Sequence, residues 1–302
     1  MSEATELVVV SGKGGVGKTT VSASLAFFYS TQRLEAVIAD ADVDTPSLHL
    51  VLGFRLKRSE EARLSKKARV DPAKCVRCGA CVRTCPYGAL EQGQDGVPEP
   101  IWYLCEGCGA CRVVCPSGAI DIVPARTGEL VEGTTRYAQP MVSAQLEVGE
   151  HNSGLLVSQV RLRARAIAAE RGAKLLLVDG APGIGCPVVS SLVGADAALV
   201  VAEPTPESLR GALRVLQVAR HFGLKTYSVL NKYDLSPFWQ EAAGKLAEAG
   251  APVLALVPYD KAVVDALAQG RPVPELYPSS RAAEALEELA EALEGLLKEG
   301  RP

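Results

Sequence analysis

The sequence has no apolar run of the ~20 residues that a membrane-spanning helix needs, and its first residues do not resemble a secretory signal. Residues 1–6 hold two acidic side chains, no basic side chain and no apolar core. Basic charge is not in excess either, because 32 Lys and Arg residues stand against 35 Asp and Glu residues, for a formal net charge of −3. This balance argues against a general nucleic-acid-binding protein. We therefore expect a cytoplasmic protein whose partners include neither a membrane nor a nucleic acid.

Histidine is scarce, and cysteine is scarce outside one segment. The three histidines, His49, His151 and His221, form no spaced cluster, so we expect structural roles for them. Eight of the nine cysteines fall between Cys75 and Cys115. In a reducing compartment, metal ligation explains such a concentration better than disulfide bonds do.

The rest of the chain has the pattern of an α/β protein. Its 302 residues are 48% hydrophobic and 22% charged, which is typical of globular proteins. Short apolar runs, such as residues 7–10, 175–178 and 197–202, alternate with helical stretches. Such runs are typical of a mostly parallel sheet buried by helices on both faces. We predict a large α/β domain in two parts, residues 1–60 and 126–302, with a small α+β domain inserted at residues 61–125.

The inserted segment is an internal duplication. Each half reads C-x2-C-x2-C-x3-C-P, first from Cys75 and again from Cys105. This is the bacterial ferredoxin pattern, in which three cysteines of one run and the fourth of the other hold each 4Fe–4S cluster, whereas a zinc site would show two C-x-x-C pairs. The pattern predicts these ligands: Cys75, Cys78, Cys81 and Cys115 for cluster 1, and Cys105, Cys108, Cys111 and Cys85 for cluster 2. Two adjacent clusters favour an electron path, and clusters that only hold the small domain together stay an alternative.

A glycine-rich loop at residues 11–20 connects an apolar run to a helical stretch. It matches G-x-x-x-x-G-K-S/T from Gly12 to Thr19, the P-loop pattern. The same glycines fit the dinucleotide pattern G-x-G-x-x-G, but that turn has no use for a Lys-Thr pair, which a P-loop needs for phosphate and Mg²⁺. The predicted nucleotide-binding residues are Gly12, Gly14, Gly15, Val16, Gly17, Lys18, Thr19 and Thr20.

With Lys13, the loop reads K-G-G-V-G-K-T-T and resembles the deviant Walker A motif of the MinD, Mrp and nitrogenase iron protein group of P-loop ATPases. The resemblance implies that Lys13 reaches across a dimer interface to the nucleotide of the partner subunit, and therefore that ATP drives homodimerisation. Residues 39–47 resemble switch I of that group, and residues 175–183 resemble Walker B running into switch II. By this resemblance the catalytic residues are Lys13, Lys18 and Asp42, the magnesium ligands are Thr19, Asp42 and Asp179, and the Gly183 N–H meets the γ-phosphate.

Recognition of the base is less specific in the sequence. Residues 231–234, N-K-Y-D, match the N-K-x-D guanine reader of GTPases. The family resemblance instead favours adenine, with Asn231 and the loop at Pro258 near the base. We therefore expect ATP as the nucleotide.

The insert narrows the resemblance to MinD-like ATPases with an inserted ferredoxin domain, which lie near Mrp-type proteins and are often labelled relatives of cobyrinic acid a,c-diamide synthase. MinD ends in a basic amphipathic membrane helix, whereas residues 281–302 carry six acids and three bases. Their apolar stripe is expected to pack on the domain or on its dimer mate; it consists of Leu286, Leu289, Leu293 and Leu296. The C-terminal C-x-x-C of Mrp-type carriers is absent.

Two further features leave alternatives open. Cys186 follows Asp179 at the offset of a cluster ligand in the nitrogenase iron protein, so a redox or metal role stands beside that of a small structural residue. Residues 55–83 carry ten basic side chains against three acidic ones, which is either a solvated face or a docking surface for an acidic protein.

Taken together, the motifs predict an ATPase that couples ATP binding and hydrolysis to electron transfer through two 4Fe–4S clusters, or to metal-cluster assembly on a protein partner. One alternative is an Mrp-like cluster carrier. Another is an ATP-dependent amidoligase, which would need a glutaminase domain with a nucleophilic Cys and a nearby His that this chain does not provide.

Overall fold

The structure is a computed structural model that describes residues 4–299, with side chains described for residues 4–296. Within this range the chain divides into two compact units. Unit 1 holds the residues up to Glu60, Leu130–Gln145 and the residues from Ser153 on. Unit 2 holds Glu61–Glu129 and the short segment Leu146–Asn152.

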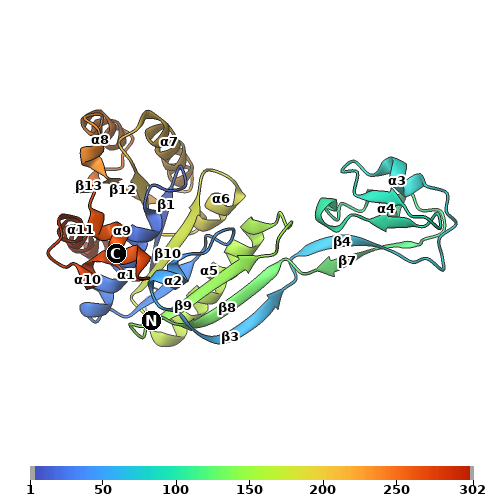
Figure 1. Ribbon diagram of the computed structural model, residues 1–302, viewed down its shortest axis with the longest axis horizontal. Coiled ribbons are helices and arrows are strands. Elements are labelled where there is room, and N and C mark those ends of the chain that lie inside the picture. The colour runs from blue at the N-terminus through green and yellow to red at the C-terminus, as the bar shows by residue number, and fades with distance from the viewer. Residues whose placement is uncertain (1–3, 300–302) are drawn as a thin grey trace. The chain divides into compact units, whose positions relative to one another are not determined.

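Unit 1 is built on a nine-stranded sheet in the order β13-β12-β11-β1-β10-β2-β9-β8-β3 (Figure 1). From β13 to β9 the neighbouring strands pair in parallel, as at Leu7–Leu177 and Val8–Ala198. This confirms the expected mostly parallel α/β sheet. The strands are β1 (Thr5–Ser11), β2 (Ala36–Asp40), β3 (Arg55–Ala62), β8 (Gly128–Thr134), β9 (Pro140–Leu146), β10 (Leu175–Pro182), β11 (Ala197–Ala202), β12 (Lys225–Asn231) and β13 (Val253–Val257).

Helices follow these strands in the alternation that the sequence predicts. The helices are α1 (Lys18–Thr31), α2 (Leu48–Val51), α5 (Ser153–Arg171), α6 (Cys186–Leu192), α7 (Pro206–His221), α8 (Trp239–Glu248), α9 (Lys261–Ala268), α10 (Val273–Leu276) and α11 (Arg281–Glu299), with a 3₁₀ turn η2 (Tyr233–Leu235). Because successive residues of a strand point to opposite faces, Leu7 and Val9 contact the α1 side of the sheet while Val10 lies near Ser191 of α6.

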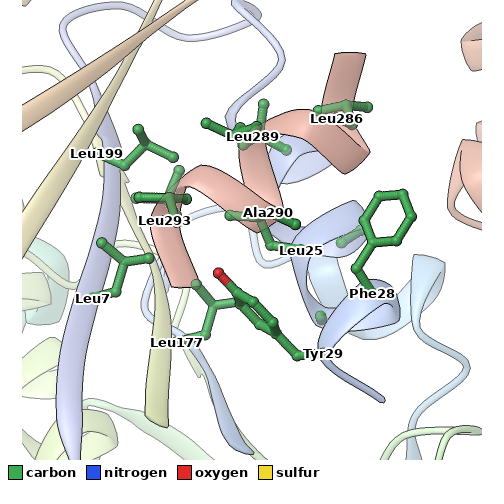
Figure 2. Packing of buried hydrophobic residues seen from close by; sticks show 14 of the residues in the cluster. Leu7, Leu25, Phe28, Tyr29, Leu177, Leu199, Leu286, Leu289, Ala290 and Leu293 are labelled. Carbon is green, nitrogen blue, oxygen red and sulfur yellow. The ribbon is translucent and has the colours of Figure 1, made fainter. Parts of the chain in front are cut away.

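The last helix belongs to the main core. Leu286, Leu289 and Leu293 of α11 are fully buried, and they lie with residues of α1 and of the central strands in one hydrophobic core (Figure 2). Burying a leucine side chain contributes about 1.5–3 kcal/mol. The predicted packing of the apolar stripe on the domain is therefore confirmed for these positions, and residues 300–302 lie outside the described part.

The sheet extension formed by β9, β8 and β3 was not predicted from the sequence. Strand β3 reads RLKRSEEA, and its residues are exposed except for the half-buried Ala62, so it has no alternation of apolar and polar residues to reveal a strand. Its basic side chains lie in solvent, and Arg58 forms an ion pair with Glu60 at 2.9 Å. This is the environment of a solvated face, and docking of an acidic partner stays a prediction.

Unit 2 contains two short antiparallel ladders, β4 with β7 and β5 with β6. Its small core combines apolar residues such as Ala68, Leu90 and Ile120 with buried cysteines. The segment 146–152 joins this unit through Glu150, whose carboxylate lies 2.9 Å from the buried Lys67 ammonium. The elements are β4 (Ser65–Val70), α3 (Ala80–Thr84), β5 (Leu90–Gln92), β6 (Pro98–Pro100), η1 (Trp102–Leu104), α4 (Ala110–Val113) and β7 (Ile120–Ala125).

Candidate functional site

The glycine-rich loop between β1 and α1 is held by close backbone contacts and open on one side. A Cβ at Gly12 would lie 2.0 Å from the Gly211 backbone of α7, and a Cβ at Gly17 would lie 2.1 Å from the Asn231 amide. By contrast, a Cβ at Gly14 or Gly15 would meet nothing within 4 Å. Gly15 and Gly17 have φ of 81° and 93°, which side-chain-bearing residues rarely adopt. The loop therefore leads with exposed backbone into the N-terminus of α1, the arrangement that binds phosphate.

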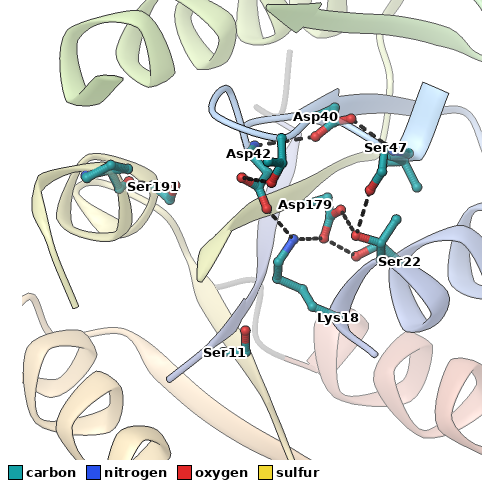
Figure 3. A network of polar contacts seen from close by, with 12 residues as sticks. Ser11, Lys18, Ser22, Asp40, Asp42, Ser47, Asp179 and Ser191 are labelled. Atoms are coloured by element: carbon teal, nitrogen blue, oxygen red, sulfur yellow. Dashed lines mark hydrogen bonds and ion pairs between the residues drawn. The ribbon is translucent and has the colours of Figure 1, made fainter. Parts of the chain in front are cut away.

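Lys18, at the first turn of α1, meets the aspartate of β10. Its Nζ lies 2.9 Å from Asp179 Oδ1, and both side chains are buried. Thr19 and Ser22 donate to the same carboxylate at 2.9 and 2.8 Å (Figure 3). The structure thus brings together Lys18, predicted to bind phosphate, with Thr19 and Asp179, predicted to bind magnesium. No motif predicted Ser22 at this place.

Two more carboxylates crowd this lysine. Asp42 Oδ2 lies 3.5 Å from Lys18 Nζ, and Asp40, at the end of β2, is fully buried and accepts the backbone N–H of Leu48 at 3.0 Å (Figure 3). Burial, and next the Asp179 carboxylate, raise the pKa of Asp40 to about 8. Burial also raises the pKa of Asp42 despite Lys18. For Lys18 itself burial lowers the pKa, but Asp179 and Asp42 outweigh it and leave the pKa raised.

This balance of charge favours binding of a cation with the nucleotide. Asp40 keeps its proton at neutral pH, and the Asp42 and Asp179 carboxylates share one ammonium group, so a divalent ion would supply the positive charge that this pair lacks. Within residues 4–299 no three His, Cys, Asp or Glu side chains converge closely enough to hold a metal ion by themselves. That fits Mg²⁺, which is usually held by one or two carboxylates together with substrate phosphates. Ser47 Oγ lies 3.4 Å from Thr19 Oγ1 and is a further polar group here that the sequence analysis missed.

Lys13 and Gly183 form contacts other than those of their predicted roles. Lys13 Nζ pairs with Glu207 of α7 at 2.9 Å, and their mutual hydrogen bond raises the pKa of Lys13 and lowers that of Glu207. The Gly183 N–H donates to the Ser11 carbonyl at 2.8 Å. A γ-phosphate would have to replace Ser11 as acceptor, and Lys13 would have to leave Glu207 to reach a partner subunit. Both roles stay predictions.

The N-K-x-D segment is used within the fold. Asn231 Nδ2 donates to the Val16 carbonyl at 2.8 Å, so Asn231 braces the P-loop from the end of β12. Asp234 Oδ1 accepts the Tyr259 N–H at 2.7 Å, and its Oδ2 lies 3.4 Å from Arg281. Both oxygens of the carboxylate that reads guanine in GTPases thus already face donors. The same bond fixes the loop after β13 that begins with buried Pro258.

The eight clustered cysteines of unit 2 line two cavities. Cavity 1 is lined by Cys75, Cys78, Cys81 and Cys115, together with residues of both repeats. Cavity 2 is lined by Cys105, Cys108, Cys111 and Cys85. Each combines three cysteines of one run with the fourth of the other. The thiols are therefore grouped as the crossed ligand pattern of two 4Fe–4S clusters requires.

Backbone N–H groups point at several of these sulfur atoms. Ala68 donates to Cys105 Sγ at 3.3 Å and Ala119 to Cys115 Sγ at 3.2 Å. Burial raises the pKa of the Cys81 and Cys111 thiols, so these two thiols stay neutral unless a metal replaces the proton. Soft thiolate ligands with N–H donors around them are suited to an iron–sulfur cluster.

Cys186 belongs to unit 1 and lines neither cavity. It is the exposed first residue of α6, and its Cβ lies 3.2 Å from the position that a Cβ on Gly154 would take. Its exposure is unlike that of a buried structural cysteine. Its role in redox or metal binding stays a prediction.

Comparison with known proteins places the chain in a family. The model of the CobQ/CobB/MinD/ParA nucleotide binding domain matches residues 7–273, so the chain belongs to this family. An uncharacterized protein of Methanocaldococcus jannaschii is 36% identical over 231 residues, which cover 76% of this chain and 79% of that protein. The structure of MinD of Pyrococcus horikoshii complexed with Mg-ADP matches 97% of each chain at 18% identity with a TM-score of 0.59, which shows a shared fold.

A shorter match concerns a different kind of protein. A ferredoxin of Pyrobaculum islandicum is 47% identical over 47 residues, which are 15% of this chain and 44% of the ferredoxin.

None of the helices among residues 4–299 combines the length and apolar character needed to span a bilayer.

Proposed function

We propose that this chain is an ATPase of the cytoplasm that carries two 4Fe–4S clusters and couples ATP binding and hydrolysis to electron transfer, or to metal-cluster assembly, on a protein partner. The observation that carries the proposal is the pair of cavities, each lined by the four cysteines that one cluster needs, in a chain that also holds a P-loop. The short ferredoxin match supports the iron–sulfur part.

On the nucleotide side, the residues present fit Mg-ATP. The N–H groups of the loop and Lys18 would hold the phosphates, while Thr19 and Asp179, now 2.9 Å apart, would separate to face Mg²⁺. The ion would neutralise charge on the β- and γ-phosphates. Asp42 would orient the attacking water, and Lys13 of a second subunit would stabilise the charge that develops on the γ-phosphate.

The contacts of Asp234 support adenine rather than guanine as the base of the nucleotide. A guanine reader needs a carboxylate free to accept two donors of the base, whereas this one holds the Tyr259 N–H and faces Arg281. The Mg-ADP complex of the structurally similar MinD agrees with an adenine nucleotide in this fold.

On the iron–sulfur side, the chain supplies thiolates, N–H donors and a protected setting. When bound, the clusters would each accept and release one electron. Cys78 and Cys108 are exposed while Cys81, Cys105 and Cys111 are buried, so each cavity has one ligand near solvent where a partner could approach. That exposure also suits an Mrp-like cluster carrier, although the C-terminal C-x-x-C of such carriers is absent. An amidoligase activity gains no support from any contact of Cys186.

Analysis of the protein purified without air tests the iron–sulfur part. We expect about eight iron and eight sulfide per monomer, and an EPR signal after reduction, because each cavity is lined by four cysteines. About two iron atoms, or stoichiometric zinc, would contradict the proposal.

Coupling requires a second measurement on the same preparation. Reduction potentials and the rate of electron or cluster transfer should differ between the nucleotide-free, ADP and non-hydrolysable ATP states. Values identical in all three states would show that the two sites only share a chain. Cys186→Ser then tests that residue: if iron content and the nucleotide effect are both unchanged, Cys186 is structural.

A further inference from the structure

The two cysteine cavities are a matched pair whose differences can be compared position by position. They arise from the duplicated halves, so residue 75 corresponds to 105 and the numbering continues in step. Gly79 and Gly109 both begin a helix in the left-handed conformation. Ala89 and Ala119 donate to Cys85 and Cys115 at 3.3 and 3.2 Å. The shared framework means that differences in the lining determine differences between the sites.

The lining differs in charge. Among the described residues, Arg77 is the one charged residue that lines cavity 1, and Glu106 is the one that lines cavity 2. The duplication places Gly107 at the position of Arg77 and Val76 at the position of Glu106. Both side chains are exposed, and Arg77 Nε donates to the Asp95 carbonyl at 2.9 Å, so cavity 1 has a positive side chain at its rim where cavity 2 has a negative one.

The surrounding loops keep the same sign of difference. Arg83 Nη2 donates to the Cys78 carbonyl at 3.2 Å, which holds a second guanidinium on the ligand loop of cavity 1. Val113 is its equivalent in the other half, and the one arginine of that half, Arg112, is exposed and is offset by Glu106. The first cysteine run thus carries two positive side chains, Arg77 and Arg83. In the second run Glu106 balances Arg112, so the net charge of its side chains is zero.

Hydrogen bonding to sulfur differs in the same direction. Backbone N–H groups donate to sulfur in both cavities: those of Arg77 and Ala119 in cavity 1, and those of Ala68 and Ala89 in cavity 2. Cavity 1 also has the Ser117 hydroxyl, 3.7 Å from Cys115 Sγ, whereas its equivalent Tyr87 is exposed.

We propose that the residues of cavity 1 give their cluster the higher reduction potential, so that an electron entering at cavity 2 passes to cavity 1. Reduction adds one negative charge to a cluster, and nearby positive charge and hydrogen-bond donors stabilise that charge. The transfer oxidises cluster 2 and reduces cluster 1 by one electron, with no bond made or broken. The electron comes from a low-potential one-electron donor. This inference rests on the proposed function, because it needs both clusters.

A redox titration of the full chain, reduced stepwise with dithionite and followed by EPR, tests the proposal. We expect an equilibrium constant of at least ten for electron transfer from cluster 2 to cluster 1, which for a one-electron couple corresponds to a potential difference of about 59 mV. Two variants then place in each half the residue that stands at the equivalent position of the other half. Arg77→Gly should lower the higher potential alone, and Glu106→Val should raise the lower potential alone.

The variants suit the backbone and have a control. Arg77 has φ of 58°, a conformation that glycine adopts readily, and Arg77→Gln removes the charge if the glycine variant loses iron. Arg69→Gln is the matched control, because Arg69 is exposed, lies 3.7 Å from Asp121 and lines neither cavity. It should move neither potential.

Failure of this inference can be told apart from failure of the proposed function. Iron well below about eight atoms, with no EPR signal, would contradict the iron–sulfur proposal itself. Two results obtained with full iron content would overturn this inference but not the proposed function. One is a redox titration with a single unresolved step, and the other is a shift of the lower potential in Arg77→Gly.

Discussion

Replacing Lys18 by methionine should destabilise the nucleotide-free protein as well as impair nucleotide binding. Lys18 Nζ lies 2.9 Å from Asp179 and 3.5 Å from Asp42, with its side chain almost fully buried. Removing one partner of a buried ion pair costs about 3–5 kcal/mol, because the other charge stays buried. Thr19 and Ser22 still donate to Asp179, so we expect about 3 kcal/mol, the lower end of that range.

The assay is thermal unfolding in EDTA without nucleotide, where loss of ligand binding cannot lower the melting temperature. For a domain of 150–250 residues, a range that includes unit 1, 3 kcal/mol corresponds to a decrease of roughly 6–12 °C. Lys13→Met is the control in the same loop. Because the ion pair of Lys13 with Glu207 is exposed, its loss should leave the melting temperature unchanged. Combining Lys18→Met with Asp179→Asn should recover part of the loss. A melting temperature for Lys18→Met equal to that of the parent would refute the reasoning.

Three other predictions concern the nucleotide site. Lys13→Ala should abolish ATP hydrolysis and nucleotide-induced dimerisation but retain ATP binding, since the loop amides and Lys18 still hold the phosphates. Phosphate release, sedimentation and ATP titration measure these three properties. Dimerisation or hydrolysis at the parental level would exclude a role of Lys13 across the interface. Asp234→Ala should free the loop at Tyr259 and so weaken ATP binding about tenfold, while titration calorimetry should show an unchanged GTP affinity. If Asp234 read guanine, the GTP affinity would fall and the ATP affinity would stay unchanged. The folded protein keeps a proton on Asp40 up to pH about 8, while the unfolded chain releases it near 3.8, so the stability of the nucleotide-free protein should fall as pH rises through that window. Asp40→Asn should flatten that fall in urea titrations, and an unchanged slope would argue against it.

The sequence predicts the parts of each site that lie on one loop or at one strand end. The P-loop residues and Asp179 could be placed because parallel strands β1 and β10 end at the same edge of the sheet, and a motif fixes the spacing on each. The cysteine grouping could be predicted because a duplicated run carries its own pairing rule.

Partners from distant segments could not be predicted in this way. Glu207 reaches Lys13 from 194 residues away, and Ser22 reaches Asp179 only because α1 packs beside β10. Asp234 matches a guanine-binding pattern, and only the tertiary contact with Tyr259 shows another use for its carboxylate. Strand β3 escaped notice because a charged, exposed edge strand has no periodic apolar signal.

Both sites contain acidic groups whose ionised form burial disfavours. The nucleotide site sets Asp40, Asp42 and Asp179 against one lysine, and burial raises the pKa of the first two. In unit 2, cysteines form part of a small core, and burial favours the protonated form of Cys81 and Cys111. A small domain with little apolar surface depends on a bound metal for stability, because the binding free energy is available only to the folded chain. Under the proposed function, each unit would gain stability from its own ligand, Mg-nucleotide for unit 1 and iron–sulfur clusters for unit 2. Coupling between them would be the additional free energy that appears only when both are bound.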